Sequence, residues 1–230
     1  MKLVYFKRGL RQKGFEMSKK RIVGINDEKL DVNIIRARTK VFEYAYCNKW
    51  DYFITLTISK EKYDRTNLQK YYRDFHQWLK DYQKKYELKI RYLFIPELHK
   101  DGESWHMHGF VSGLPPNHLN EFVPGKHPMK LIEKGYQNWE AYEKKFGFVS
   151  VDRIRSNEAA AKYVTKYINK ALESSIKGLG AHLYYCSKGL KVAEEIKRGT
   201  LCENVPFEYE NDYVKIAWFD NETQADLQFI

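Results

Sequence analysis

The chain has 230 residues, of which 43% are hydrophobic and 30% are charged. This is enough apolar surface for one compact domain, which excludes a wholly disordered or fibrous protein. Forty Lys and Arg residues against thirty Asp and Glu residues leave a net charge of +10 at pH 7. An excess of this size favours a polyanionic partner, above all nucleic acid, and the alternative is a basic protein with no such partner.

The three cysteines, Cys47, Cys186 and Cys202, include no Cys-x-x-Cys pair. They indicate neither a disulfide framework nor a thiolate zinc site. No apolar stretch approaches the roughly 18 residues of a membrane span, and the first apolar run is too short for a secretory signal. We therefore expect a protein of the reducing cytoplasm with no membrane partner.

Residues 1–20 are strongly basic, and we expect them to form an arm that lies on a phosphate backbone. A short strand at 21–25 and a helix at about 33–47 follow. The apolar periodicity and turn signals then predict, in chain order, a strand at 52–58, a helix at 66–86, strands at 90–96 and 105–112, an irregular stretch at 115–135, a short helix near 137–145, a strand at 148–154 and a helix from Ser156 to about Leu172.

This order of elements predicts an α+β fold, in which an antiparallel sheet is covered by helices. Residues 182–186 predict one more strand, whereas the last thirty residues give no clear pattern. We expect a single domain over residues 1–230, with the basic arm at 1–20, a core at 48–175 and an extension of the same domain at 176–230.

Two histidines, His106 and His108, lie two residues apart on a predicted strand. Side chains alternate faces along a strand, so both imidazoles point the same way and could form half of a metal site. The Asp-Gly turn at 101–102 would bring Glu97 opposite them. A carboxylate with two imidazoles suits Mg²⁺ or Mn²⁺ holding a phosphate, with His99 as a rival third ligand. The alternative is a pair of partly exposed polar residues without a metal.

Two tyrosines, Tyr163 and Tyr167, are four residues apart and so share one face of a helix. Each is followed three residues later by a lysine, Lys166 or Lys170. A tyrosine that attacks phosphorus must approach the phenolate, so a neighbouring ammonium or a metal-polarised phosphate helps. Lys162 extends the basic stripe toward a DNA backbone. The alternative is that both tyrosines only pack the helix on the sheet.

Three motifs together resemble a known family. Residues 105–108, WHMH, resemble the His-hydrophobic-His motif of the HUH endonucleases. Residues 163–170, YVTKYINK, resemble the two-tyrosine motif of rolling-circle replication initiators from small single-stranded DNA phages and plasmids. Residues 53–59, FITLTIS, are similar to the first motif of that family, and the three occur in the expected order.

The resemblance implies a five-stranded antiparallel HUH palm of ferredoxin-like type. It also implies a metal-dependent nick in single-stranded origin DNA that leaves a 5′-phosphotyrosine and a free 3′-OH, followed later by rejoining. By position, the ligands of Mg²⁺ or Mn²⁺ would be His106, His108 and Glu97, and the nucleophiles Tyr163 and Tyr167, assisted by Lys166 and Lys170. We expect further DNA contacts from Thr55, Thr57, Arg153, Arg155 and Lys162.

The sequence contains no GxxxxGK[ST] phosphate loop. We therefore expect no helicase domain, and unwinding and synthesis by a host helicase and polymerase in the cytoplasm of a bacterial host. Two alternatives stay open. One is a transposase or plasmid-transfer relaxase with the same chemistry. The other is a single-strand nucleic-acid-binding module without catalysis, although the RNA-recognition consensus is absent and such a module has no need of Glu97 beside the histidines.

Overall fold

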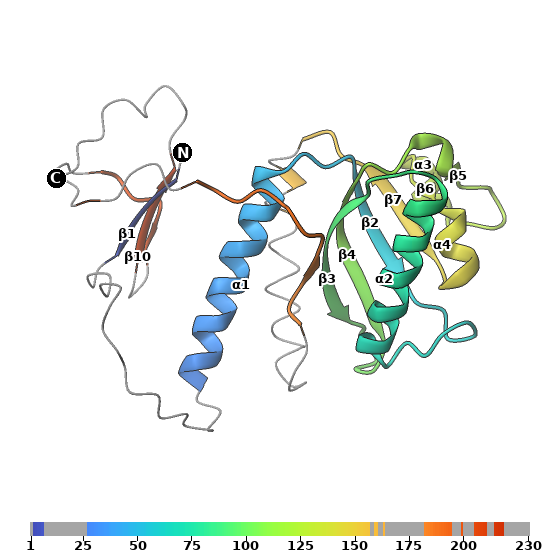
Figure 1. Cartoon of the computed structure of the whole chain (residues 1–230), viewed down its shortest axis with the longest axis horizontal. Coiled ribbons are helices and arrows are strands. Elements are labelled where there is room, and N and C mark those ends of the chain that lie inside the picture. Colours follow the sequence, from blue (N-terminus) through green and yellow to red (C-terminus); the bar gives the residue numbers. More distant parts are fainter. Residues whose placement is uncertain are drawn as a thin grey trace. The chain divides into compact units, whose positions relative to one another are not determined.

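The computed structural model describes residues 2–6, 27–156, 159–160, 163, 182–194, 199, 205–210 and 214–218 (Figure 1). The chain divides into two compact units, one formed by residues 1–24 and 194–230 and the other by residues 25–193. The single domain over residues 1–230 that the sequence predicts stays a prediction. The two ends of the chain join in one unit through a strand pairing between residues far apart in sequence, which local periodicity does not reveal.

The unit formed by the chain ends contains a three-stranded antiparallel sheet in the order β1-β10-β9. Its strands are β1 (Lys2–Phe6), β9 (Tyr209–Glu210) and β10 (Val214–Trp218). The beginning of the expected basic arm is therefore a strand rather than a free arm. Residues 7–20 and the strand expected at 21–25 lie outside the described residues.

The other unit is built on a seven-stranded antiparallel sheet in the order β5-β6-β7-β2-β4-β3-β8. The α+β fold is thus confirmed. The sheet has seven strands where the resemblance implies five. Of its two-residue strands, β8 lies within the strand predicted at 182–186, whereas β5 and β6 are too short to give a sequence pattern. The strands are β2 (Tyr52–Thr57), β3 (Arg91–Leu98), β4 (Trp105–Ser112), β5 (Asn120–Glu121), β6 (Gln137–Asn138), β7 (Val149–Arg153) and β8 (Tyr185–Cys186).

One face of this sheet is covered by α2 (Leu68–Lys85) and α4 (Glu140–Lys145) (Figure 1). The amide of Lys70 donates to the side chain of Asn67, which caps the start of α2. From α2 the apolar stripe that includes Phe75 enters the core, where it meets aromatic residues near α4 and the buried side chains of β2. The predicted irregular stretch contains the 3₁₀ turn Pro116–His118, β5 and the short helix α3 (Met129–Glu133).

The opposite face is apolar at one end and polar at the other. At the apolar end, Val41 and Ala45 of α1 (Asp27–Cys47) pack in a cluster with Leu93 and Phe110. Along β2, buried residues alternate with partly exposed ones, so every second side chain belongs to this face. The polar end carries the residues described next. Within the described part of the chain, no helix is long and apolar enough to cross a membrane.

Candidate functional site

The two histidines of β4 lie on the partly polar face of the sheet. The ring centroids of His106 and His108 are 6.3 Å apart, and the rings are inclined by 30°. Met107, between them, is completely buried in the core on the other face. The period of two along the strand therefore puts both imidazoles side by side.

Glu97 reaches the histidines across the β3–β4 hairpin. The register places Glu97 directly opposite His106. Its Oε2 atom lies 2.8 Å from Nε2 of His108, and the two side chains are only 10% and 13% exposed, respectively. Burying a carboxylate is costly unless a partner compensates the charge, so this position is one that favours a cationic partner.

The threonines of β2 contact the histidines from the other side. Thr57 is opposite His106 and Thr55 is opposite His108 in the β2–β4 register. In each pair the hydroxyl oxygen lies 3.1 Å from Nδ1 of the ring and shares a hydrogen bond with it. The sequence predicted DNA contacts for both threonines, whereas the structure directs their hydroxyls to the imidazoles.

The turn of the hairpin is held by Asp101. Its carboxylate accepts hydrogen bonds from the backbone amides of Glu103 and Ser104 at 3.0 and 2.9 Å and from the Ser104 hydroxyl at 2.6 Å. The Ser104 hydroxyl and these amides hold the pKa of Asp101 far below its usual range. A fixed turn keeps Glu97 in register with His106.

The rival ligand His99 is also close to the pair. Its ring centroid lies 4.9 Å from that of His106, although its side chain is 50% exposed and its Nδ1 atom is 3.6 Å from Asp101 Oδ2. Burial lowers the pKa of His106, and the neighbouring charges of His108 and His99 act in the same direction. At neutral pH this favours the uncharged imidazole, which is the form that binds metals.

One of the two candidate nucleophiles is described, and an aromatic contact links it to the histidines. Residues 159, 160 and 163 are helical, and the amide of Ala159 donates to the hydroxyl of Ser156, which caps this helix as expected. The ring of Phe53 lies 5.4 Å from that of Tyr163 and 6.5 Å from that of His108, centroid to centroid. Tyr163 is therefore held above the polar end of the sheet.

The other members of the predicted tyrosine motif lie outside the described residues; they are Lys162, Lys166, Tyr167 and Lys170. Of the two predicted arginine contacts, Arg153 is paired with Tyr52, whose side chain belongs to the opposite core. Alternation along β7 therefore turns Arg153 away from the histidines. Arg155 follows the end of β7 and is exposed.

Sequence reasoning missed two groups near Tyr163. Burial raises the pKa of Tyr136, and the charge of Asp152, the proximity of Tyr163 and a hydrogen bond to Asp152 raise it further. Asp152 lies opposite Phe53 in the β2–β7 pairing, so it shares the face of the histidines. The alternation of β7 could have placed Asp152, but Tyr136 comes from an irregular segment without a pattern.

A cationic hollow beside Thr57 was also missed. Its lining includes the basic residues Lys60, Lys62 and Arg65, which follow the end of β2. Lys62 donates to the carbonyl oxygen of Glu143, and Arg65 lies 3.6 Å from Asp101. The glutamates Glu61 and Glu143 also line it, so the basic side chains outnumber the acidic ones by one. Because Thr57 lines it too, this hollow continues the polar end of the sheet with a small excess of positive charge.

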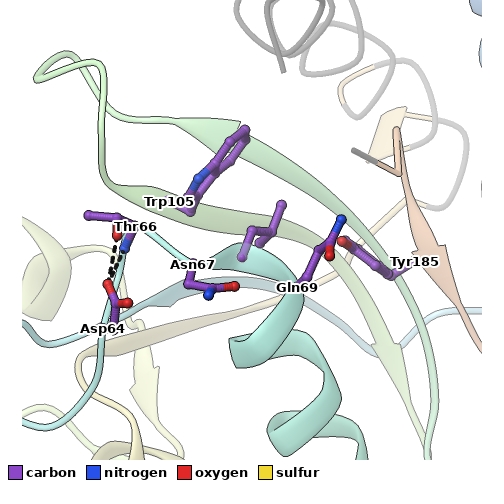
Figure 2. A pocket seen from close by; sticks show the side chains of 7 residues that line it. Asp64, Thr66, Asn67, Gln69, Trp105 and Tyr185 are labelled. Atoms are coloured by element: carbon purple, nitrogen blue, oxygen red, sulfur yellow. Dashed lines mark hydrogen bonds between the residues drawn. The ribbon is translucent and has the colours of Figure 1, made fainter. Parts of the chain in front are cut away.

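A second hollow lies at the start of α2, beside Trp105 and Tyr185 (Figure 2). Trp105 immediately precedes His106, so its side chain belongs to the opposite side of β4 and packs against the core under α2. Within the hollow, Asp64 accepts hydrogen bonds from the hydroxyl and amide of Thr66, which lower the pKa of Asp64.

The donor types around His106 fit a divalent cation, because imidazole nitrogens and a carboxylate oxygen are ligands that Mn²⁺ and Mg²⁺ accept. Among the described residues, however, no three His, Cys, Asp or Glu side chains are arranged so that they could hold a metal ion. Glu97 and His108 contact each other directly at 2.8 Å. Metal binding would require this contact to open so that both side chains turn to one ion.

Comparison with known proteins adds one finding. A family model described as replication-associated protein ORF2 matches residues 51–172, just over half of the chain. The matched stretch contains β2, the β3–β4 hairpin and both tyrosines of the motif. Neither the curated proteins nor the solved structures include a significant match.

Proposed function

The chain belongs to the ORF2 family of replication-associated proteins, and we propose that it initiates rolling-circle replication by nicking single-stranded origin DNA. Membership of this family indicates a replication initiator. The nicking chemistry rests on one structural observation. Glu97, His106 and His108 lie together on one sheet face, and Phe53 connects that face to Tyr163.

In the proposed reaction, Tyr163 or Tyr167 attacks the scissile phosphate. The bond from the phenolic oxygen to phosphorus forms, and the bond from phosphorus to the 3′ oxygen breaks. The tyrosine loses its proton, the departing 3′ oxygen takes one up, and the products are a 5′-phosphotyrosine and a free 3′-OH. A divalent cation held by the two histidines and Glu97 would polarise the phosphate and stabilise the charge that develops on it. Rejoining is the reverse attack by a 3′-OH, which expels the tyrosine.

Positive charge near the site supports binding of a single strand. The hollow beside Thr57 carries Lys60, Lys62 and Arg65, and the chain as a whole has a net charge of +10. Phosphate contacts from such groups supply affinity without sequence preference. The lysines of the tyrosine motif, Lys166 and Lys170, would then stabilise the phenolate. Unwinding and synthesis would be left to a host helicase and a host polymerase.

The test is adduct formation on a labelled single-stranded oligonucleotide that carries the origin of the replicon. Protein, oligonucleotide and Mn²⁺ should give a band that survives denaturing electrophoresis, and EDTA should abolish it. His108→Ala should remove the adduct while single-strand binding largely persists, because binding depends on phosphate contacts. The double variant Tyr163→Phe with Tyr167→Phe should also form no adduct, and its matched control is Tyr86→Phe, because Tyr86 at the end of α2 is 42% exposed and Tyr163 is 46% exposed.

Two results would contradict the proposal. An adduct that forms undiminished in EDTA would remove the metal from the mechanism. Binding of the strand without any adduct would favour a non-catalytic single-strand-binding module. A transposase or relaxase would form the same adduct, but it would act at transposon ends or a transfer origin, and the match to a replication-associated family favours initiation.

A further inference from the structure

We propose that Thr55 and Thr57 are positioning residues that orient the two imidazoles for the metal. This inference rests on the proposed function, because it assigns a role to residues around the same site. The resemblance to an initiator motif marks the Thr-Leu-Thr stretch without saying what its hydroxyls do. The structure gives each hydroxyl one defined partner, a ring nitrogen of a candidate metal ligand.

The assignment follows from the sheet geometry. Phe53, Thr55 and Thr57 alternate with buried residues along β2, so all three face the side of the histidines. Thr57 is in register with His106 and Thr55 with His108, and both oxygen-to-Nδ1 distances are 3.1 Å. The same interaction therefore occurs twice, one pair after the other along the two strands.

The nitrogen that each threonine occupies decides which nitrogen is available to a metal. Because Nδ1 of each ring is hydrogen-bonded to a threonine hydroxyl, Nε2 is the ring nitrogen that would bind a metal. In His108, Nε2 already points at Glu97. A hydroxyl can both donate and accept, so it can hold the ring in either neutral tautomer. When Nε2 binds a metal, Nδ1 carries the proton and donates it to the threonine oxygen.

Hydrogen bonds to the second ring nitrogen of a metal-binding histidine commonly affect the affinity for the metal. Removing a partner of a ligating histidine typically costs about 10- to 100-fold in metal affinity or activity. Valine has nearly the shape of threonine and also suits a strand, so Thr55→Val and Thr57→Val remove the hydroxyl with little change in packing. Serine restores a hydroxyl, so Thr55→Ser and Thr57→Ser should recover most of the affinity.

The experiment measures Mn²⁺ binding by calorimetry in the absence of DNA. We expect each valine variant to bind about 10- to 100-fold more weakly than the original chain and each serine variant to bind nearly as well. Ser150→Ala is the matched control, because Ser150 lies opposite Thr55 on β7, two strands away from the histidines. Thermal unfolding of every variant verifies that the sheet is intact.

A second measurement does not depend on the metal. The ¹⁵N resonances of the imidazoles in metal-free protein should show that Thr57→Val shifts Nδ1 of His106 and leaves Nδ1 of His108 nearly unchanged. Thr55→Val should do the reverse. If each variant shifts both rings equally or shifts neither, the threonines do not act on one imidazole each, and the positioning role is overturned.

The outcomes separate this inference from the proposed function. If the original chain binds Mn²⁺ and the valine variants bind it equally well, the positioning role is overturned while the metal site stands. If valine variants keep their Mn²⁺ affinity but lose affinity for single-stranded DNA, the threonines contact the strand instead, as the sequence predicted. If the original chain binds no Mn²⁺ at all, the proposed metal site is overturned and this inference with it.

Discussion

Replacing Gly109 by alanine would test how closely the central strands must approach for the site to form. Gly109 lies on β4 between Ile54 of β2 and Phe94 of β3. A Cβ atom at this position would overlap the carbonyl oxygen of Leu93 and lie 2.9 Å from both the carbonyl carbon of Leu93 and the Cα atom of Phe94. Ordinary contacts of a Cβ begin at 3.4 Å, so even the two longer distances are 0.5 Å too short (3.4 − 2.9).

The magnitude follows from the position of β4 in the sheet. All three clashing atoms are backbone atoms, and β4 cannot move away from β3 without moving into β2. Overpacking in a core costs about 1 to 3 kcal/mol, and a clash with backbone on a central strand belongs at the upper end. We therefore expect a loss of about 3 kcal/mol, which is a large part of the roughly 5 to 15 kcal/mol that stabilises a domain.

Urea unfolding followed by tryptophan fluorescence measures this loss, because four of the five tryptophans lie in residues 25–193. The control is Gly125→Ala, where φ is +83° and no atom lies within 4 Å of the added Cβ. Only the left-handed backbone is strained there, at about 1 to 2 kcal/mol. If Gly109→Ala lowers the free energy of unfolding no more than Gly125→Ala does, the close approach of β3 to β4 does not require a glycine at position 109.

Three further predictions concern the hairpin, the tyrosines and the arm. Folding lowers the pKa of Asp101, so its ionised carboxylate stabilises the folded chain fully above the unfolded pKa near 3.9 and progressively less as the pH falls toward the folded pKa. The gap in melting temperature between the original chain and Asp101→Asn should therefore narrow below about pH 4. A gap that does not change with pH would contradict this. Tyr163→Phe and Tyr167→Phe should each retain single cleavage but lose repeated cycles, and the double variant should form no adduct. If one single variant forms no adduct and peptide mapping of the original chain finds DNA on the same tyrosine alone, the shared role is refuted. Substituting the basic residues between 7 and 20 by neutral ones keeps the sequence of strand Lys2–Phe6. The plot of log affinity against log salt concentration for single-strand binding should then become shallower, by about 0.7 for each phosphate that is no longer neutralised. An unchanged slope in anisotropy titrations would show that these residues do not touch DNA.

The sequence by itself determined the elements whose side chains follow a regular period. The run of β-branched and aromatic residues at 52–58 and the 3.6-residue stripe at 66–86 predict β2 and α2 almost at their observed bounds. The same alternation puts His106 and His108 on one face, and the Asp-Gly turn predicts that Glu97 lies opposite them, as the register has it. These features depend on neighbours within a few residues, so local pattern is sufficient.

Only the tertiary structure decided which atoms meet. The contact of Glu97 with His108, and the hydrogen bonds between the threonines of β2 and Nδ1 of each ring, depend on pairings between strands about fifty residues apart or on side-chain rotamers. The joining of Lys2–Phe6 with Val214–Trp218 is a still longer-range pairing. Such pairings are selected by the packing of the whole sheet, because many strand partners satisfy the same local alternation and only one arrangement buries all the apolar faces together.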